Sequence, residues 1–99
     1  MLEQKQIIQY LSSNKQYIIQ KYGLKKLGIF GSYARNEQTS KSDLDLLVEF
    51  EDNTPDLAGK KEKLKAEIQA VFHISVDICR EKYMKPFFRE QILSETLYV

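Results

Sequence analysis

The segment DLDLLVEF, residues 43–50, constrains the fold more than any other part of the chain. Alternate residues of an extended segment point to opposite faces. One face carries Leu44, Leu46, Val48 and Phe50, and the other carries Asp43, Asp45, Leu47 and Glu49. This period of two predicts a strand that buries its first face. Aspartate is depleted from strands, so the acids on the second face need either solvent or a partner that neutralises them.

Apolar spacing predicts two elements before this strand. A helix is expected over about residues 3–22, where apolar side chains recur with a helical period and Gly23 stops the pattern. LKKLGIF, residues 24–30, reads as a short strand that ends at Gly31. A brief helical turn is expected to follow, with the Ser32 hydroxyl as its N-cap.

Three further elements are expected after the turn-rich sequence EDNTPD, residues 51–56. A helix is expected to bury one apolar stripe, formed by Leu57, Leu64, Ile68, Val71 and Phe72. HISVDIC, residues 73–79, predicts a third strand, and Pro86 predicts the start of a last helix. Phe87, Phe88 and Tyr98 suit either a core or an interface.

The element order predicts the fold class. Helix, strand, strand, helix, strand and helix together favour an α+β (α/β) fold, a small mixed sheet of about three strands with helices packed on it. A chain of 99 residues is long enough for one core, so we expect a single domain over residues 1–99.

Composition excludes several function classes. The net charge of +1 lacks the basic excess that sequence-independent nucleic-acid binding needs, so no direct binding to nucleic acid is expected. The apolar stretches are too short for a membrane span, and the N-terminal residues do not form a signal peptide. The single cysteine, Cys79, excludes an internal disulfide and fits a cytoplasmic location, where it is expected as a buried thiol.

Three aspartates form the strongest candidate site. Asp43 and Asp45 lie two residues apart, which places their Cα atoms about 7 Å apart on one face of a strand. Asp77 interrupts the third strand in the same way, so all three carboxylates converge if the second and third strands are neighbours. Carboxylates in such a group suit Mg²⁺ together with substrate phosphates, as in two-metal phosphoryl or nucleotidyl transfer. Taken singly, each aspartate is more typical of a solvated surface.

Gly31 and Ser32 form a candidate phosphate site at the end of the first strand. Glycine lets an anion approach the backbone, and the start of a helical turn offers N–H groups and a hydroxyl. Arg35, one turn later, carries a planar donor group that reaches the same anion. A Gly-Ser pair alone is weak, because it occurs often by chance.

The combination of these motifs resembles a known family. The signature of the DNA polymerase β-like nucleotidyltransferase superfamily is matched by Gly31-Ser32, ten intervening residues and then Asp43-Leu44-Asp45. The chain also resembles the minimal nucleotidyltransferase (MNT) family in the fuller pattern GSYARN…SDLDLLVEF, in the VDI strand and in the ending ILSETLYV. The likeness covers nearly the whole chain. It implies the polymerase β-like fold and a partnership with HEPN-domain toxins, because MNT proteins commonly act as their antitoxins.

The resemblance also implies residue roles. Asp43, Asp45 and Asp77 would be catalytic and would bind two Mg²⁺ ions, and Asp77 would help to deprotonate the acceptor hydroxyl. Gly31 and Ser32 would hold the triphosphate of ATP. Arg35 would either contact phosphate or pair with an acid to stabilise the turn. The family often has glycine after this arginine; Asn36 replaces it here and tolerates a left-handed conformation.

Three functions remain open at this point. The first is AMP transfer from ATP to a hydroxyl, on the resemblance a tyrosine of a HEPN ribonuclease toxin. The second is a non-catalytic antitoxin that neutralises the toxin by binding. The third is transfer to a small molecule of the aminoglycoside type, although relatives that do so generally carry an extra helical domain.

Overall fold

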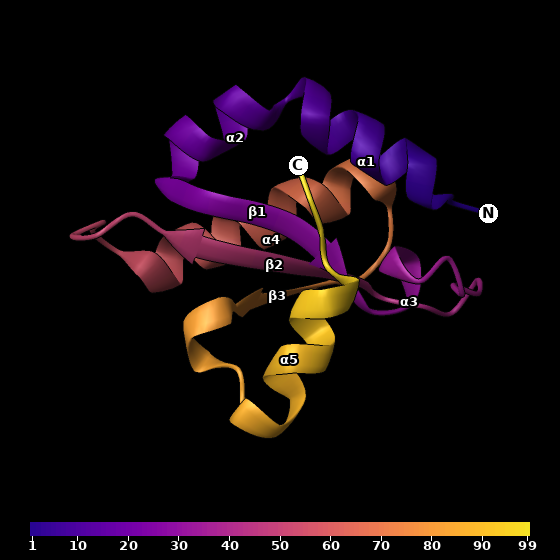
Figure 1. Ribbon diagram of the computed structural model, residues 1–99. Coiled ribbons are helices and arrows are strands. Elements are labelled where there is room, and N and C mark those ends of the chain that lie inside the picture. Colours follow the sequence, from indigo (N-terminus) through magenta and orange to yellow (C-terminus); the bar gives the residue numbers. More distant parts are fainter.

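A computed structural model describes all 99 residues and places a four-stranded sheet at the centre (Figure 1). The strand order is β3-β2-β1-β4, and the strands are β1 (Leu24–Phe30), β2 (Leu44–Phe50), β3 (Val76–Arg80) and β4 (Leu97–Tyr98). β1 runs antiparallel to β2 and β4, whereas β2 and β3 are parallel. The predicted mixed sheet is confirmed. β4 was not predicted, because a strand of two residues shows no alternation.

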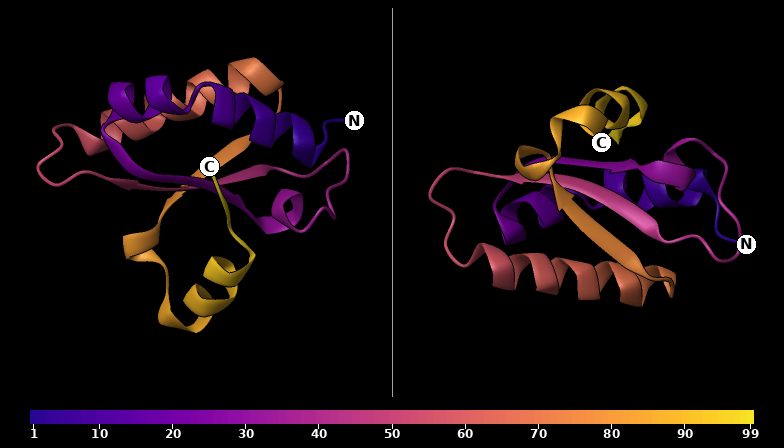
Figure 2. Two further views of the ribbon diagram at one scale, coloured as in Figure 1. Left: turned by 45° about the horizontal axis from the view of Figure 1, so that its top comes forward. Right: turned by 90° about the horizontal axis from the view of Figure 1, so that it is seen from below.

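Helices cover the two faces of the sheet unequally. They are α1 (Gln4–Ser13), α2 (Lys15–Tyr22), α3 (Gly31–Ala34), α4 (Leu57–Phe72) and α5 (Pro86–Glu95), with a 3₁₀ turn η1 (Glu81–Tyr83). α1, α2 and α4 pack on one face, and α5 stands below the other (Figure 2). We call these the helix face and the open face. None of the helices combines the length and the apolar character that a membrane crossing needs.

The helix face holds the hydrophobic core. Sixteen buried apolar residues form one cluster there, and it includes the four apolar residues that alternate along β2. Burying each leucine-sized side chain stabilises the fold by about 1.5–3 kcal/mol. The stripe predicted for α4 is wrong at Val71, which is 37% exposed; the buried residues of this helix are Leu64 and Ile68.

The expected N-terminal helix is divided in two. Asn14 leaves the helical conformation with φ −108° and ψ 12°, and its side-chain amide donates a hydrogen bond to the Tyr10 carbonyl at 2.9 Å. Asparagine competes in this way with the helical ladder, so α1 ends there and α2 begins at Lys15. Gly23 ends α2 with φ 68°, as predicted.

α4 connects β2 to its parallel neighbour β3. Asp56 caps α4 by accepting a hydrogen bond from the Gly59 N–H at 3.2 Å. The crossover brings β3 beside β2, which positions the candidate site. α5 has no buried residue, and Phe87 and Phe88 are 87% and 49% exposed, so these two rings lie outside the core.

Candidate active site

Strand register places two of the three aspartates side by side. Asp45 on β2 is the Cα partner of Asp77 on β3, and it is also the partner of Phe30 at the end of β1. Directly opposed residues on neighbouring strands share one face of the sheet. The expectation that the second and third strands are neighbours is therefore confirmed, and the two carboxylates lie on the open face.

The third aspartate lies at the entrance to β2. Asp43 directly precedes the first strand residue and is exposed, as is Asp77, whereas Asp45 is partly buried. Burial is the main cause that raises the pKa of Asp45 from 3.8 to about 6; the charges of Asp77 and Asp43 raise it further, and Arg35 opposes them. The charges of Asp43 and Asp77 are thus both close enough to act on Asp45.

The three aspartates could supply some of the ligands of a metal ion, but not all of them. Nowhere in the chain do three His, Cys, Asp or Glu side chains lie close enough together to hold a metal ion. None of the salt bridges of the chain involves Asp43, Asp45 or Asp77. Mg²⁺ is usually held by one or two carboxylates, with waters and substrate phosphates as the other ligands. The neighbouring carboxylates of Asp45 and Asp77 fit that pattern, and Asp43 lies within electrostatic reach.

Gly31 allows the first turn of α3 to press against Asp45. Its φ is 75°, and a Cβ atom at this position would collide with Asp45 Oδ2. The prediction that Ser32 caps the turn is wrong: the N-cap is Phe30, and Ser32 is the second residue of α3, where it is partly exposed. The chain turns one residue early because glycine takes the positive φ. Asn36 takes a left-handed conformation, φ 58°, as the sequence predicts.

Arg35 pairs with an acid that sequence reasoning missed. Its Nη1 atom donates to Glu95 Oε2 at 3.0 Å, and Glu95 Oε1 accepts from the Gly31 N–H at 3.1 Å. Of the two roles left open for Arg35, the structure shows acid pairing, while its guanidinium stays exposed beside the acids. Glu95 lies at the end of α5, and nothing in its local sequence separates it from an ordinary surface glutamate.

Two other side chains near the site are buried. Tyr33 is only 2% exposed and therefore packs beneath the turn. Glu49, on the same face as the aspartates, accepts a hydrogen bond from Arg80 at 2.7 Å. Burial opposes ionisation of Glu49, but the Arg80 hydrogen bond and charge outweigh it and keep the pKa of Glu49 below its ordinary value.

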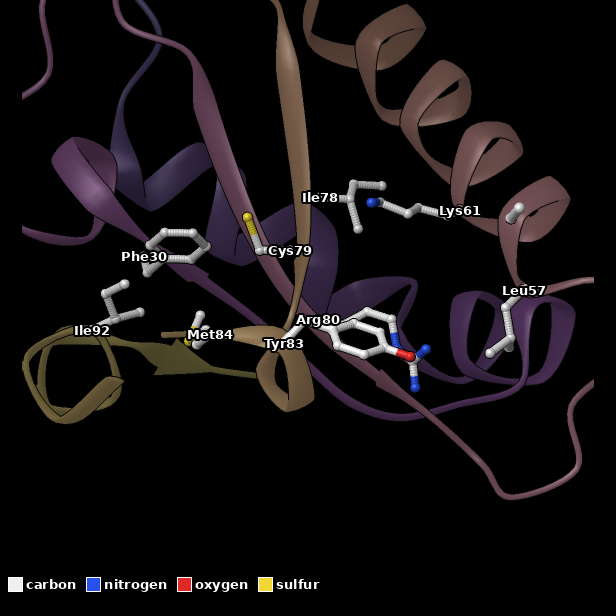
Figure 3. Close-up of a pocket in the computed structure, with 10 residues that line it drawn as sticks. Phe30, Leu57, Lys61, Ile78, Cys79, Arg80, Tyr83, Met84 and Ile92 are labelled. Atoms are coloured by element: carbon white, nitrogen blue, oxygen red, sulfur yellow. The ribbon is translucent and has the colours of Figure 1, made fainter. Parts of the chain in front are cut away.

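A groove of about 650 Å³ lies along β3 (Figure 3). Phe30 and Cys79 line it from the open face of the sheet, and Ile92 lines it from α5. Burial raises the pKa of the Cys79 thiol, and the charges of Asp45 and Asp77 raise it further, so the thiol lies near both acids. The groove therefore gives the acid pair an apolar neighbour large enough for part of a substrate.

Sequence comparisons identify the relatives of this chain. A family model described as nucleotidyltransferase domain matches residues 5–99. A Thermococcus cleftensis protein named protein adenylyltransferase MntA is 32% identical over 99 residues, covering 100% of this chain and 98% of the relative. A Methanocaldococcus jannaschii protein, named as a candidate protein adenylyltransferase, is 41% identical over 90 residues, or 90% of either chain.

Solved structures agree with this match. A structure described as a candidate minimal nucleotidyltransferase superposes with a TM-score of 0.80 and 29% identity, covering 97% of this chain and 95% of the other. A toxin–antitoxin structure with AMP-PNP has a TM-score of 0.67 over 98% of this chain and 72% of the other. Its 19% identity shows a likeness of fold alone.

Proposed function

Since the chain belongs to the nucleotidyltransferase domain family, we propose that it transfers AMP from ATP to a hydroxyl group of a partner protein. The hydroxyl oxygen bonds to the α-phosphorus, and the bond from that phosphorus to the bridging oxygen breaks. Pyrophosphate leaves with the electron pair, and the hydroxyl proton passes to a carboxylate. The observation that carries this proposal is the pairing of Asp45 with Asp77 beside Gly31.

The three aspartates divide the chemical work. Asp43, Asp45 and Asp77 would hold two Mg²⁺ ions, which supply positive charge to the reacting phosphate when bound. Asp77 is exposed at the edge of the open face, where an incoming hydroxyl can reach it, and it accepts the proton. Partial burial raises the pKa of Asp45 to about 6, so a nearby cation would strongly favour the ionised form of this carboxyl group.

The Gly31–Arg35 turn would bind the triphosphate. The Gly31 N–H, the Ser32 hydroxyl and the Arg35 guanidinium all belong to the turn that presses on Asp45. Phosphate oxygens would replace the Glu95 carboxylate on both the Gly31 N–H and Arg35, so that each donor keeps a charge-assisted hydrogen bond. Nucleotide and metal would then meet between this turn and the acid pair.

The acceptor is proposed to be a tyrosine of a HEPN-domain ribonuclease toxin in the cytoplasm. One relative is named MntA, and one structural neighbour is a toxin–antitoxin complex with a nucleotide analogue. AMP on a tyrosine adds a negative charge and considerable bulk, either of which can silence a nuclease site. The chain would therefore act as an antitoxin by modifying its partner.

Labelled ATP tests this proposal. Incubation of the chain with Mg²⁺, α-labelled ATP and its toxin partner should label the toxin, and the double variant Asp43→Ala, Asp45→Ala should label it at least 100-fold less. A matched double variant, Glu51→Ala with Asp52→Ala, removes two exposed acids just after the other end of β2 and should keep full activity. Equal labelling by the aspartate variant would contradict the proposal.

The second candidate is neutralisation by binding without transfer. The exposed rings of Tyr83, Phe87 and Phe88 favour it, because they offer a contact surface that does not involve the acids. A cell-protection assay separates the two candidates. Full protection by the Asp43→Ala, Asp45→Ala variant would favour binding, whereas loss of protection would favour transfer.

A further inference from the structure

The outer edge of β3 is a strand edge without a neighbour. β3 is the last strand of the sheet, and β2 is its only partner. The Leu44 N–H donates to the Ser75 carbonyl, so Ser75, Asp77 and Cys79 direct their backbone groups toward β2. The residues between them direct theirs outward. An open edge of this kind is a template for another strand.

Most of the outward backbone groups of β3 have no partner within the chain. The Val76 N–H is capped by the Gln69 side chain at 3.3 Å. The amides of Ile78 and Arg80 take part in none of the turn, loop or side-chain hydrogen bonds. Their donors therefore remain available along the part of β3 that adjoins the groove.

The groove lies over this edge and has a wall on each side. Figure 3 shows Lys61 and Leu57 of α4 on one side of β3, and Met84 and Ile92 on the other. Eight of its ten lining residues are hydrophobic, and Lys61 has no salt bridge. A strand laid on β3 would put alternate side chains against these two walls. The Lys61 ammonium would complement an acidic residue in that strand.

The outer edge of β3 also adjoins the acid pair, Asp45 and Asp77. Asp77 belongs to β3, and a strand added beside β3 would run about 4.8 Å from it. A side chain of that strand on the open face would then lie next to the Asp77 carboxylate. A hydroxyl at the end of such a side chain reaches the position where AMP transfer needs its acceptor.

From these observations we propose that the β3 edge binds an extended, acidic segment of the acceptor protein as an additional strand. This inference rests on the proposed function, because it describes how the acceptor hydroxyl reaches the site of AMP transfer. The backbone pairing supplies affinity, and the side-chain alternation brings one hydroxyl to Asp77. The partner is thus defined by an extended conformation, an acidic residue that reaches Lys61, and a tyrosine, serine or threonine that reaches Asp77.

Amide hydrogen exchange tests the pairing directly and without nucleotide. The probe is a short capped peptide of alternating threonine and valine, with a central tyrosine and glutamates at both ends. At saturating peptide, the Ile78 and Arg80 amides should become at least 10-fold more protected, whereas those of Asp77 and Cys79, already bonded to β2, should not change. The same peptide with N-methylated amides on its pairing edge should give no protection.

A groove-filling variant provides the second measurement. Ala58 is exposed on α4 and lines the groove, so Ala58→Trp should weaken peptide binding at least 10-fold without disturbing the core. Ala66→Trp is the matched control, because Ala66 is exposed on the same helix outside the groove. Equal binding by Ala58→Trp would overturn the inference.

Other outcomes also overturn it. Protection confined to β4, or shifts confined to α5, would place the peptide elsewhere. The same Ile78 and Arg80 protection by ATP alone would assign the groove to the nucleotide. Because the peptide experiment contains no nucleotide, failure of AMP transfer leaves its result standing, and failure of peptide binding leaves the transfer assay unaffected.

Discussion

Two groups of acidic residues in this chain differ in their charge partners and in the direction of their pKa shifts. Asp45 and Asp77 lie side by side with no cation of the chain bound to them, and the pKa of Asp45 is raised to about 6. Glu49 and Glu67 are each bound to a cation, and both have a lowered pKa. Burial raises the pKa of Glu67, but hydrogen bonds from Tyr22 and Lys21 and the charge of Lys21 outweigh it.

The difference is the one expected between acids that stabilise the fold and, under the proposed function, acids that bind a metal ion. Glu49 gains its partner Arg80 on folding, so its charge belongs to the folded structure. Asp45 loses water on folding and meets further negative charge, which is unfavourable unless a cation arrives from outside. Acids with strongly shifted pKa values cluster at functional sites, which supports the proposed metal site.

The largest expected effect is on activity at the unpaired acids. Asp45→Asn should lower AMP transfer at least 100-fold, because it removes a central carboxylate of the proposed metal site. The fold should remain intact, since the substitution keeps the shape and removes repulsion by Asp77 and Asp43. Transfer assays with thermal unfolding of the same samples check both parts. Retained transfer would remove the distinction between the two groups.

The opposite pattern is expected at a paired acid. Glu49→Gln should destabilise the fold by about 2–3 kcal/mol, because it leaves the largely buried Arg80 guanidinium without its carboxylate. At a temperature where the variant is folded, transfer should stay within about a factor of three of wild type. Denaturant unfolding measures the loss, and Glu51→Gln, an exposed acid after the same strand, should show less than 0.5 kcal/mol.

The pH dependence of stability also distinguishes the two groups of acids. The folded-state pKa of Asp45 is about 6 and its unfolded value is 3.8, so folding favours the protonated form. Its contribution is most favourable below pH 3.8 and is lost as the pH rises through 6. For metal-free protein, Asp45 should therefore lower stability by about 1–2 kcal/mol between pH 4 and pH 7, a value discounted for solvent screening.

Unfolding of wild type and Asp45→Asn from pH 4 to pH 8 measures this contribution as the difference between the two curves. The variant should gain on wild type as the pH rises. A difference that stays constant, or that reverses, would show that Asp45 does not carry an unfavourable charge.

The smallest effect is expected in the second network of paired groups. The Tyr22 hydroxyl donates to Glu67 at 2.6 Å, and Lys21 donates to the same oxygen at 2.9 Å. Tyr22→Phe should reduce stability by about 1 kcal/mol and leave transfer unchanged, since this network lies away from the acids. Tyr17→Phe is a gentler control, because its 3.3 Å bond to Glu67 is longer and exposed.

Local patterns predicted the elements that have long, regular repeats. The alternation along β2 was sufficient to orient Asp45 onto the face opposite the core, and the same pattern oriented Asp77 on β3. The missed features are those set by contacts between distant segments. β4 depends on its pairing with Gly28 and Ile29, and Glu95 reaches Gly31 across 64 residues. Short elements and single long-range hydrogen bonds leave no periodic signal in a sequence.

Prediction of the candidate site was limited in the same way, by contacts between distant segments. The sequence supplied Asp45, Asp77 and Gly31 as a group, and the register of β2 with β3 brings the two acids together. The alternation alone does not distinguish the paired Glu49 from the unpaired Asp45, because both residues lie on the same face of β2. That distinction depends on Arg80, which reaches Glu49 only once β3 lies beside β2.

Calorimetric titration of ATP into the protein, in Mg²⁺ and in EDTA, tests the central claim most directly. If the unpaired acids await a cation that arrives with the nucleotide, wild type should bind ATP at least 10-fold more tightly in Mg²⁺. The double variant Asp45→Asn, Asp77→Asn should lose that difference. Equal ATP affinity in Mg²⁺ and in EDTA for wild type, or an undiminished Mg²⁺ effect in the variant, would contradict the account.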